Sequence, residues 1–360
     1  MPDTTTAYQK ILSEREIKKV KSFSIQQRDA GQRLDKYLHR ILPEATSGFL
    51  HKMLRKKNIL WNDKRAEGRE ILQAGDQVQL YFSEETFAKF SGKTGTASSI
   101  NKETEQYISA YGKIAGITVI YEDEDLIFLN KPAGVLSQKS TGDDISLNEW
   151  MIGYLLKTKS ITEESLSMYH PSVCNRLDRN TSGCILCGKT LQGSRFLNQL
   201  LQERSLHKYY LTFVSGEIEA EGYLSGYLRK NEITNKVKIV QEISESDAQN
   251  YDKIETSYRP LCYHSESDVT ELEVLLITGK SHQIRAHFAF IHHPLIGDVK
   301  YGGPIMKNMP AYQLLHAYRI VFPEMEGYFS YLSGKEWTAP KPGLFKKMEA
   351  KLCPHGIPEA

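Results

Sequence analysis

The pattern of hydrophobic positions, with helical and strand spacings, predicts a short front part followed by a longer body. In the front part, apolar residues at helical spacing from Leu34 to Leu42 stop at Pro43 and predict one helix. A second helix is predicted to begin at Ser47, where apolar residues again recur on one side: Phe49, Leu50, Met53 and Leu54. Short strands separated by polar turns are predicted at 58–61 and 77–82.

The body is predicted to begin near Ile117. Short apolar or alternating runs bounded by turn residues predict strands at 119–121, 126–129, 184–187, 208–214, 236–239 and 271–277. Helices are predicted around 147–156 and after Ser281. Hairpin-like strand pairs mixed with helices predict an α+β fold with a large, mostly antiparallel mixed sheet, flanked by helices, beside a small N-terminal α/β domain.

Composition changes along the chain suggest the domain boundaries. Residues 84–114 are rich in Ser, Thr, Gly, Lys and Glu, which predicts a linker with a weak helix near 103–111. This linker would separate a small domain at 31–83 from a larger one at 115–325. We expect residues 1–30 to be an N-terminal extension and residues 326–360 to be a C-terminal tail.

Overall composition is that of an ordinary globular protein. The 360 residues are 40% hydrophobic and 25% charged. No apolar run approaches the length of a membrane span, and the start is polar, so we expect a cytoplasmic protein without signal peptide or transmembrane helix. The five cysteines do not form a disulfide framework. Cys184 and Cys187 have the spacing of half a zinc site, but no second pair follows, so we interpret both as buried structural residues.

The distribution of charge is more informative than the net charge of +2. Residues 1–83 hold 16 Lys or Arg and 10 Asp or Glu, a net charge of +6, which leaves −4 for the remainder. The second predicted helix carries His51, Lys52, Arg55, Lys56 and Lys57 on its polar side, with no acid between them. A solvated helix face normally mixes both signs, so we interpret this face as a phosphate-binding surface.

The segment 175–183 reads Asn-Arg-Leu-Asp-Arg-Asn-Thr-Ser-Gly and places one carboxylate, Asp178, between two arginines. Arginine neighbours keep a partly buried carboxylate ionised, and an ionised carboxylate in a rigid turn can act as a nucleophile or base. The alternative is an ordinary surface loop with a salt bridge.

The sequence of this segment resembles the signature of the RluA-type pseudouridine synthases, His-Arg-Leu-Asp-x-x-Thr-Ser-Gly. Asn175 stands where the family usually has His. Three further blocks follow the family's order. Residues 130–134 resemble its Asn-Lys-Pro-x-Gly segment, 208–211 its Lys-x-Tyr-Leu motif, and 278–287 its Thr-Gly-Arg-x-His-Gln-Ile-Arg-x-His block, with Lys280 in place of the first Arg. Residues 31–83 look like the S4-like RNA-binding domain.

The resemblance implies the roles of individual residues. Asp178 would be the catalytic aspartate and Arg285 the basic residue that pairs with it. Tyr210 would lie against the target base, although a tyrosine in a strand is more often a core residue. The predicted substrate-binding residues are Arg176, Arg179, Ile284 and Lys280 in the body, and Lys52, Arg55 and Lys56 in the front domain. No acid accompanies the histidines at 282, 287, 292 and 293 at a ligand spacing, so we expect no metal.

The implied activity is the conversion of uridine to pseudouridine in structured RNA, without a cofactor. Large-subunit (23S) ribosomal RNA is the first candidate substrate and transfer RNA the second; we expect neither DNA nor a membrane as a partner, and a monomer. The flipped base and the ribose are both possible points of attack for Asp178. The rival hypothesis is a non-catalytic RNA-binding or ribosome-assembly factor on the same fold, which the departures at Asn175 and Lys280 favour.

Overall fold

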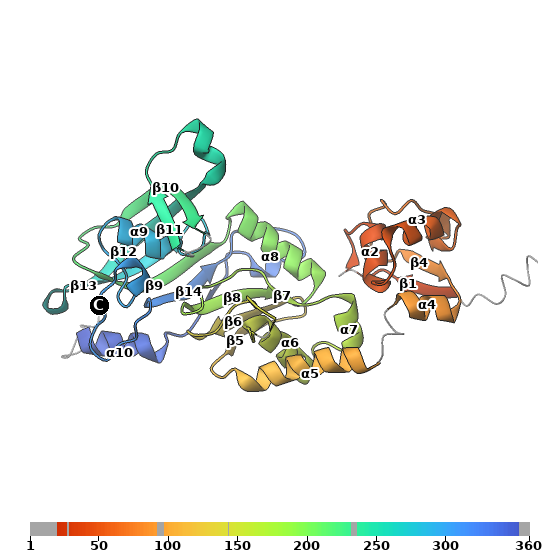
Figure 1. The fold of residues 1–360 in the computed structure, drawn as a ribbon, viewed down its shortest axis with the longest axis horizontal. Coiled ribbons are helices and arrows are strands. Elements are labelled where there is room, and N and C mark those ends of the chain that lie inside the picture. Colours follow the sequence, from red (N-terminus) through yellow and green to blue (C-terminus); the bar gives the residue numbers. More distant parts are fainter. Residues whose placement is uncertain (1–19, 27–28, 92–96, 143, 232–235, 353–360) are drawn as a thin grey trace, which may run out of the picture. The chain divides into compact units, whose positions relative to one another are not determined.

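The structure is a computed structural model that describes residues 20–352 apart from 27–28, 92–96, 143 and 232–235. The chain divides into two compact units. Figure 1 shows the helices and strands of both. The first unit contains residues up to 113 together with 149–171 and 189–194; the second contains 114–148, 172–188 and the chain from 195 onwards. Two segments that the sequence assigned to the larger domain therefore cluster with the front part.

The N-terminal part of the first unit is a small antiparallel sheet with helices. Among the described residues the strand order is β1(Val20–Ser24), β4(Gln77–Tyr81), β2(Ile59–Trp61) and β3(Lys64–Arg65). Helices α2(Leu34–Ile41) and α3(Ser47–Arg55) supply Leu34, Leu38, Leu50 and Leu54 to its core. Helix α3 begins at Ser47 because the Thr46 side chain accepts the backbone N–H of Phe49. Both predicted helices and both predicted strands are confirmed.

Two boundaries of this unit were predicted wrongly. Strand β1 and the buried Ile25 lie inside the stretch assigned to an N-terminal extension, and β1 pairs with β4 along its whole length. The predicted linker contains α4(Glu84–Phe90), capped by Ser83, and α5(Ala97–Lys113). Helix α4 was not predicted and α5 was predicted only in part, near 103–111, yet Phe87 of α4 and Ala110 of α5 are buried.

Helix α5 belongs to a second helical cluster of the first unit, with α6(Leu147–Lys157) and α7(Glu163–Met168). The ring of Tyr111 packs against those of Trp150 and Tyr154. Gly153 permits this close approach, because a Cβ there would lie 2.0 Å from the backbone oxygen of Tyr107. The helix predicted near 103–111 is therefore present as part of α5, but it packs against another helix, so the prediction of a linker is wrong there.

The second unit is built on one large mixed sheet. Its order in the described residues is β11-β10-β12-β13-β9-β14-β8-β6-β5, with β15 beside β14 and β7 beside β8. The bounds are β5(Thr118–Glu122), β6(Leu126–Lys131), β7(Ser172–Val173), β8(Ser182–Gly188), β9(His207–Ser215), β10(Gly222–Asn231), β11(Lys236–Val240), β12(Asp252–His264), β13(Val269–Leu276), β14(Leu315–Val321) and β15(Glu336–Thr338). Only the β8–β14 pair is parallel among these pairs. The α+β fold with a mostly antiparallel mixed sheet is confirmed.

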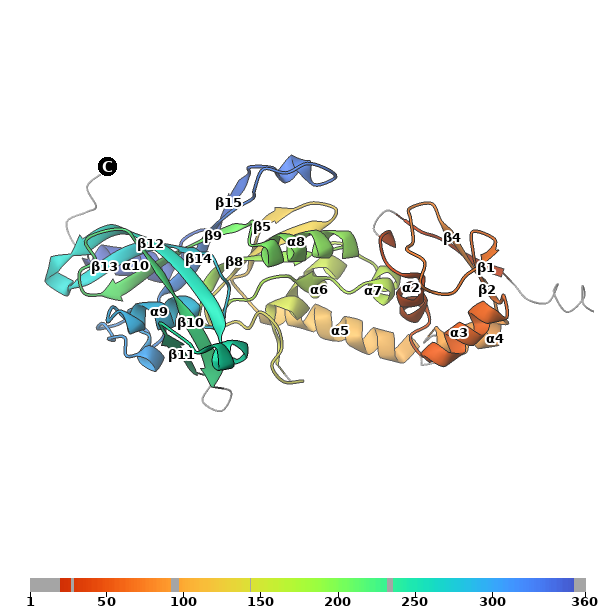
Figure 2. The ribbon, with the colours of Figure 1, turned by 90° about the horizontal axis from the view of Figure 1, so that it is seen from above.

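Helices of the second unit cover both faces of the sheet (Figure 2). Helix α9(Gln283–Phe290) places Ala286 against apolar residues of β10, β11 and β12. Helix α10(Gly343–Leu352) places Phe345 against Phe213 of β9. Side chains alternate along a strand, so the neighbouring Tyr210 and Thr212 face away from α10. Helix α8(Leu191–Glu203) supplies Leu197 and Leu200 to another apolar cluster.

The sequence missed three long strands of this sheet, β10, β12 and β14, and the two short strands β7 and β15. Strand β12 contains Pro260 and an irregular register between Pro260 and Cys262, and its buried and exposed positions do not alternate regularly. The predicted C-terminal tail is also wrong, because β15 pairs with β14 and α10 buries Phe345, Met348 and Leu352. These residues complete the core of the second unit.

Cys184 and Cys187 are fully buried in β8. In the described residues, no three His, Cys, Asp or Glu side chains gather where they could hold a metal ion. Among the helices of the same residues, none combines the length and the apolar character that crossing a membrane would require.

Candidate active site

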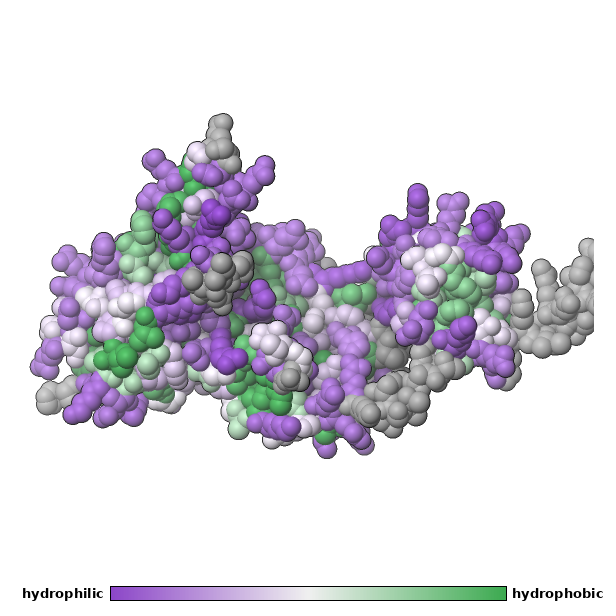
Figure 3. Space-filling view, viewed as in Figure 1, coloured by the Kyte–Doolittle hydropathy of each residue, from purple (hydrophilic) through white to green (hydrophobic). Residues whose placement is uncertain are grey.

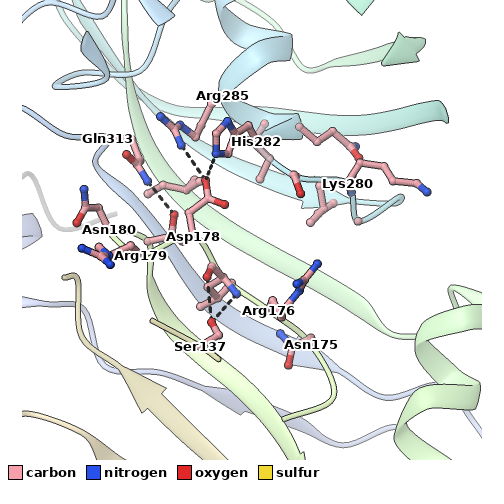
Figure 4. A pocket seen from close by; sticks show the side chains of 18 of the residues that line it. Ser137, Asn175, Arg176, Asp178, Arg179, Asn180, Lys280, His282, Arg285 and Gln313 are labelled. Atoms are coloured by element: carbon pink, nitrogen blue, oxygen red, sulfur yellow. Dashed lines mark hydrogen bonds and ion pairs between the residues drawn. The ribbon is translucent and has the colours of Figure 1, made fainter. Parts of the chain in front are cut away.

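A pocket of about 1140 Å³ opens in the second unit, and its lining combines all three predicted catalytic residues. Figure 4 shows two of them, Asp178 and Arg285, pointing toward each other. The loop 174–181, which precedes β8, supplies Asp178. Strand β9 supplies Tyr210, and the start of α9 supplies Arg285. Residues far apart in the sequence therefore meet because β9 lies close to β8 in the sheet, with β14 between them.

Asp178 and Arg285 are in direct contact, as predicted. Nη1 of Arg285 donates to Oδ2 of Asp178 at 2.9 Å. The Asp178 side chain is 26% exposed and that of Arg285 only 7%, so the carboxylate faces the pocket while the guanidinium lies behind it. The imidazole of His282 also faces Asp178, with Nε2 3.8 Å from the same Oδ2.

The sequence analysis missed a second carboxylate, Asp298, which binds the other side of Arg285. Nε and Nη2 of Arg285 donate to its two oxygens at 2.6 and 2.8 Å, the bidentate geometry of a strong arginine pair. The Asp298 side chain is 1% exposed. Burial opposes the charge on Arg285, but the bonds and charges of Asp298 and Asp178 outweigh it and raise the pKa of Arg285. Arg285 is therefore held charged between two carboxylates.

The loop that carries Asp178 is fixed by the neighbouring segment 131–137. Nζ of Lys131 donates to the carbonyl oxygens of Pro132, Val135 and Arg179 at 3.1, 2.8 and 3.0 Å. Ser137 bonds both the N–H and the carbonyl of Leu177. The three carbonyls match the three N–H groups of an ammonium, and the Lys131 side chain is fully buried. Burial lowers the pKa of Lys131 to about 7, with the charge of Asp178 acting in the opposite direction.

Gly183 closes the same loop against the sheet. Its φ is +116°, and a Cβ at this position would lie 2.1 Å from the backbone oxygen of Ala317 in β14. Only glycine permits this approach without a shift of the backbone. The final residue of the 175–183 motif is therefore required by the β8–β14 pairing.

The remaining residues of the motif take two directions. Asn175 turns its side chain to the sheet, where Oδ1 accepts the backbone N–H of Leu186 at 2.7 Å. Arg176 and Arg179 are exposed and line the pocket. In the described residues, neither of these arginines bonds Asp178, which leaves Arg285 as its arginine partner.

Tyr210 and Ile284 line the pocket and are 5% and 4% exposed. Burial and, to a lesser degree, the negative charge of Asp178 raise the pKa of Tyr210, so its phenol stays protonated. Lys208 precedes Tyr210 by two positions on the same strand and also lines the pocket. Burial and the nearby Arg204 lower its pKa, and no carboxylate within the described residues pairs with it.

The other predicted substrate-binding residues have different surroundings. Lys280 lies at the pocket and forms an ion pair with Asp252 at 2.7 Å. Lys52 and Arg55 are exposed on α3 of the first unit, and Lys56 is exposed at the C-cap of the same helix. Basic residues Arg229 and Lys238 are exposed on β10 and β11 of the second unit, where hydrophilic side chains dominate the surface (Figure 3).

Comparison with known proteins agrees with this site. A family model described as RNA pseudouridylate synthase matches residues 125–290, which contain Asp178, Tyr210 and Arg285. Residues 125–290 belong to the RNA pseudouridylate synthase family. The resemblance to the RluA-type enzymes is thereby confirmed, and the chain is an RNA pseudouridine synthase.

Named relatives cover most of this synthase. The "Ribosomal large subunit pseudouridine synthase C" of Rickettsia bellii is 29% identical over 290 residues, which are 80% of this chain and 89% of the relative. The "Ribosomal large subunit pseudouridine synthase D" of Neisseria meningitidis serogroup A is 25% identical over 307 residues, 82% of this chain and 73% of the relative. The solved structure of "Human RNA Pseudouridylate Synthase Domain Containing 4" aligns with a TM-score of 0.48 at 17% identity, covering 71% of this chain and 99% of that one.

Within this synthase, the sequence analysis overlooked four residues that surround the catalytic pair: Asp298, Lys131, Lys208 and His282. Three of them stand in blocks already quoted, and Asp298 follows the last block between glycines. A single, partly exposed carboxylate does not offset the cost of burying an arginine charge. An arginine predicted to lie in a cleft therefore indicates a second acid nearby, and this argument could have pointed to Asp298.

Proposed function

We propose that this synthase isomerises uridine to pseudouridine in large-subunit ribosomal RNA, with Asp178 as the reacting carboxylate. The names of the relatives support the choice of RNA. The observation that carries the assignment of Asp178 is its position: it reaches the pocket while a buried, doubly paired arginine holds one of its oxygens.

The chemistry needs a group of this kind. The C–N glycosidic bond of uridine breaks, the uracil turns, and its C5 joins the ribose, so substrate and product have the same atoms. A stacked base cannot turn, so the nucleotide must be flipped into the pocket. An ionised Asp178 can then serve as nucleophile or base at either the ribose or the uracil ring.

Aromatic, apolar and basic side chains around Asp178 suit a flipped nucleotide. Tyr210 offers a ring for the base to stack on, and Ile284 an apolar neighbour. Arg176 and Arg179 are exposed at the pocket, where guanidinium groups can bind phosphate. A second role proposed for Arg176 is to fill the space that the flipped nucleotide leaves.

The N-terminal part of the first unit is proposed to bind the same RNA as an S4-like domain. Its two short helices followed by small strands have the expected order, with Lys52 and Arg55 exposed on the second helix and Lys56 exposed at its C-cap. Phosphate contacts of this kind contribute affinity that falls with salt and carry little sequence information.

Tritium release from RNA labelled at C5 of uridine tests the activity, because the isomerisation replaces the C5 hydrogen. Mapping of pseudouridine in ribosomal and transfer RNA from a deletion strain then names the site. Loss of a pseudouridine from transfer RNA alone would overturn the ribosomal assignment while leaving the activity in place.

The rival function, a non-catalytic RNA-binding factor, finds no support in the two departures from the family pattern. Asn175 bonds the backbone of β8, and Lys280 bonds Asp252; neither contact involves Asp178. Absence of tritium release by the purified protein, from RNA of the deletion strain, would favour this rival.

A further inference from the structure

His282 immediately precedes α9 and has a left-handed backbone conformation, which is uncommon among non-glycine residues. Its φ is +56°, in the left-handed region that favours glycine and, to a lesser degree, asparagine. Such a conformation costs on the order of 1 kcal/mol and persists where the surroundings impose it. Here it directs the imidazole, whose side chain is 12% exposed, towards Asp178 (Figure 4).

The other ring nitrogen of this imidazole, Nδ1, contacts Tyr301. The Tyr301 hydroxyl lies 2.9 Å from Nδ1 of His282, and the two rings meet edge to face. The same hydroxyl accepts the backbone N–H of Val237 at 3.0 Å. That N–H can only donate, so the proton of the Tyr301 hydroxyl is left for another partner. Among the described residues, Nδ1 of His282 is the acceptor within reach.

This chain of bonds favours the tautomer of His282 in which Nδ1 accepts the Tyr301 proton. Nδ1 accepts, so in the neutral ring the hydrogen is on Nε2, the atom that faces Oδ2 of Asp178. Burial lowers the pKa of His282; Asp178 and Asp298 oppose the shift, while Arg285 and Lys300 add to it. The ring is therefore neutral around pH 7 and presents a hydrogen-bond donor to the carboxylate.

We propose that His282 is a positioning residue for Asp178. Its Nε2–H and Nη1 of Arg285 together hold Oδ2, which leaves Oδ1 for the substrate. In the described residues no hydrogen bond falls on Oδ1. The Nε2–Oδ2 distance of 3.8 Å is longer than a hydrogen bond. We expect it to shorten when RNA binds, because catalytic hydrogen bonds often tighten when the reacting complex forms. The inference rests on the proposed role of Asp178.

Two substitutions separate a donor role from a backbone role. His282→Gln keeps an N–H at about the distance of Nε2 from the main chain. His282→Asn loses that reach, but asparagine tolerates a positive φ better than glutamine. If His282 positions Asp178, Asn should lower the single-turnover rate constant about tenfold, with half-saturation changed less than twofold, and Gln should retain more activity. If only the backbone matters, Asn should be the more active variant.

Tyr301→Phe completes the experiment as a double-mutant cycle. The phenylalanine keeps the ring but removes the hydroxyl that orients the imidazole. If the hydroxyl acts through His282, Tyr301→Phe should slow the wild type several-fold and add nothing to His282→Asn. Additive effects would mean that the hydroxyl acts through Val237 and β11 instead, and would overturn the proposed chain of bonds.

The substrate for these rates is bulk RNA from a strain lacking this gene, labelled with [5-³H]uridine, which contains the natural target whichever RNA carries it. Release by the wild type establishes the activity separately. An Asp178→Asn variant that stays active would contradict the proposed function. If Asp178→Asn loses activity as expected while the rate of His282→Asn stays within twofold of the wild type, only the role of His282 is contradicted. Thermal unfolding of each variant checks that the fold is retained.

Discussion

Asp178 and Asp298 bind opposite sides of the same arginine, so matched Asp→Asn substitutions should have opposite consequences. Each replaces a carboxylate by an amide of the same size. Asp178→Asn should abolish turnover while leaving stability nearly unchanged. Asp298→Asn should weaken the fold strongly while leaving a measurable rate. The difference follows from exposure, because the side chain of Asp178 is 26% exposed and that of Asp298 is 1% exposed.

The magnitudes can be worked from these surroundings. Without the charge of Asp178, Arg285 keeps both bonds to Asp298, and the loss of a partly exposed pair costs less than about 1 kcal/mol. Without the charge of Asp298, a 7%-exposed guanidinium loses its bidentate partner, and breaking a buried pair costs about 3–5 kcal/mol. Loss of the reacting group should lower the rate at least about 1000-fold, whereas a loosened Arg285 should lower it roughly tenfold.

Urea unfolding gives the stability difference, and tritium release below the unfolding range gives the rate. Asp252→Asn is the matched control, since Asp252 is a half-exposed acid paired with Lys280 beside the same pocket. Equal destabilisation by Asp178→Asn and Asp298→Asn would refute the assignment of Asp298 as the structural partner. Turnover of Asp178→Asn within about tenfold of the wild type would refute the assignment of Asp178.

Three further variants test other charged groups of the protein. Replacement of Lys52, Arg55 and Lys56 by Gln should weaken RNA binding and reduce the slope of log affinity against log salt by about 2–3, with the rate at saturating enzyme unchanged. Filter binding at several salt concentrations measures this slope, and an unchanged slope would contradict contact with the RNA backbone. Lys208→Gln should reduce the same slope by about 1, because an ammonium without a carboxylate partner among the described residues is available for a phosphate. The folded-state pKa of Lys131, about 7, lies below its ordinary 10.5, so the wild type should gain stability relative to Lys131→Met as pH rises from about 7 to 10. Urea unfolding at several pH values measures the difference in free energy of unfolding between the two proteins, and a difference that does not change with pH would refute the depressed pKa.

The sequence predicted the elements whose periodicity is strong and missed those whose pattern is diluted. Strand β8 reads as a continuous apolar run and is buried throughout, so its prediction needed no tertiary information. Strand β12 has no regular alternation of buried and exposed positions over its 13 residues and contains a proline, so it is defined by its pairing with β10 and β13. Helix α5 is likewise defined by what packs on it, since Tyr111 finds its partners in α6.

The catalytic pair was predictable because Asp178 and Arg285 stand in motifs of distinctive wording. Their surroundings were not, because no local pattern relates Asp298, Tyr301 and His282 to Asp178. The chain direction at His282 depends on a positive φ that its residue type does not suggest. The tautomer of its ring depends on a backbone N–H of β11, more than 40 positions earlier in the chain. Such couplings exist only once the sheet is assembled.

The contacts of the 175–183 motif explain why a change at its first position is compatible with catalysis. Asp178 is the member that bonds Arg285, while Asn175, Thr181 and Gly183 face the sheet or the neighbouring loop. The requirement at position 175 is an acceptor for the Leu186 N–H, which an asparagine oxygen meets at 2.7 Å. A side chain without an acceptor would leave that N–H unsatisfied beside buried β8, at a cost of about 1–3 kcal/mol. Asn175→Leu should therefore destabilise the protein, and Asn175→Asp should not.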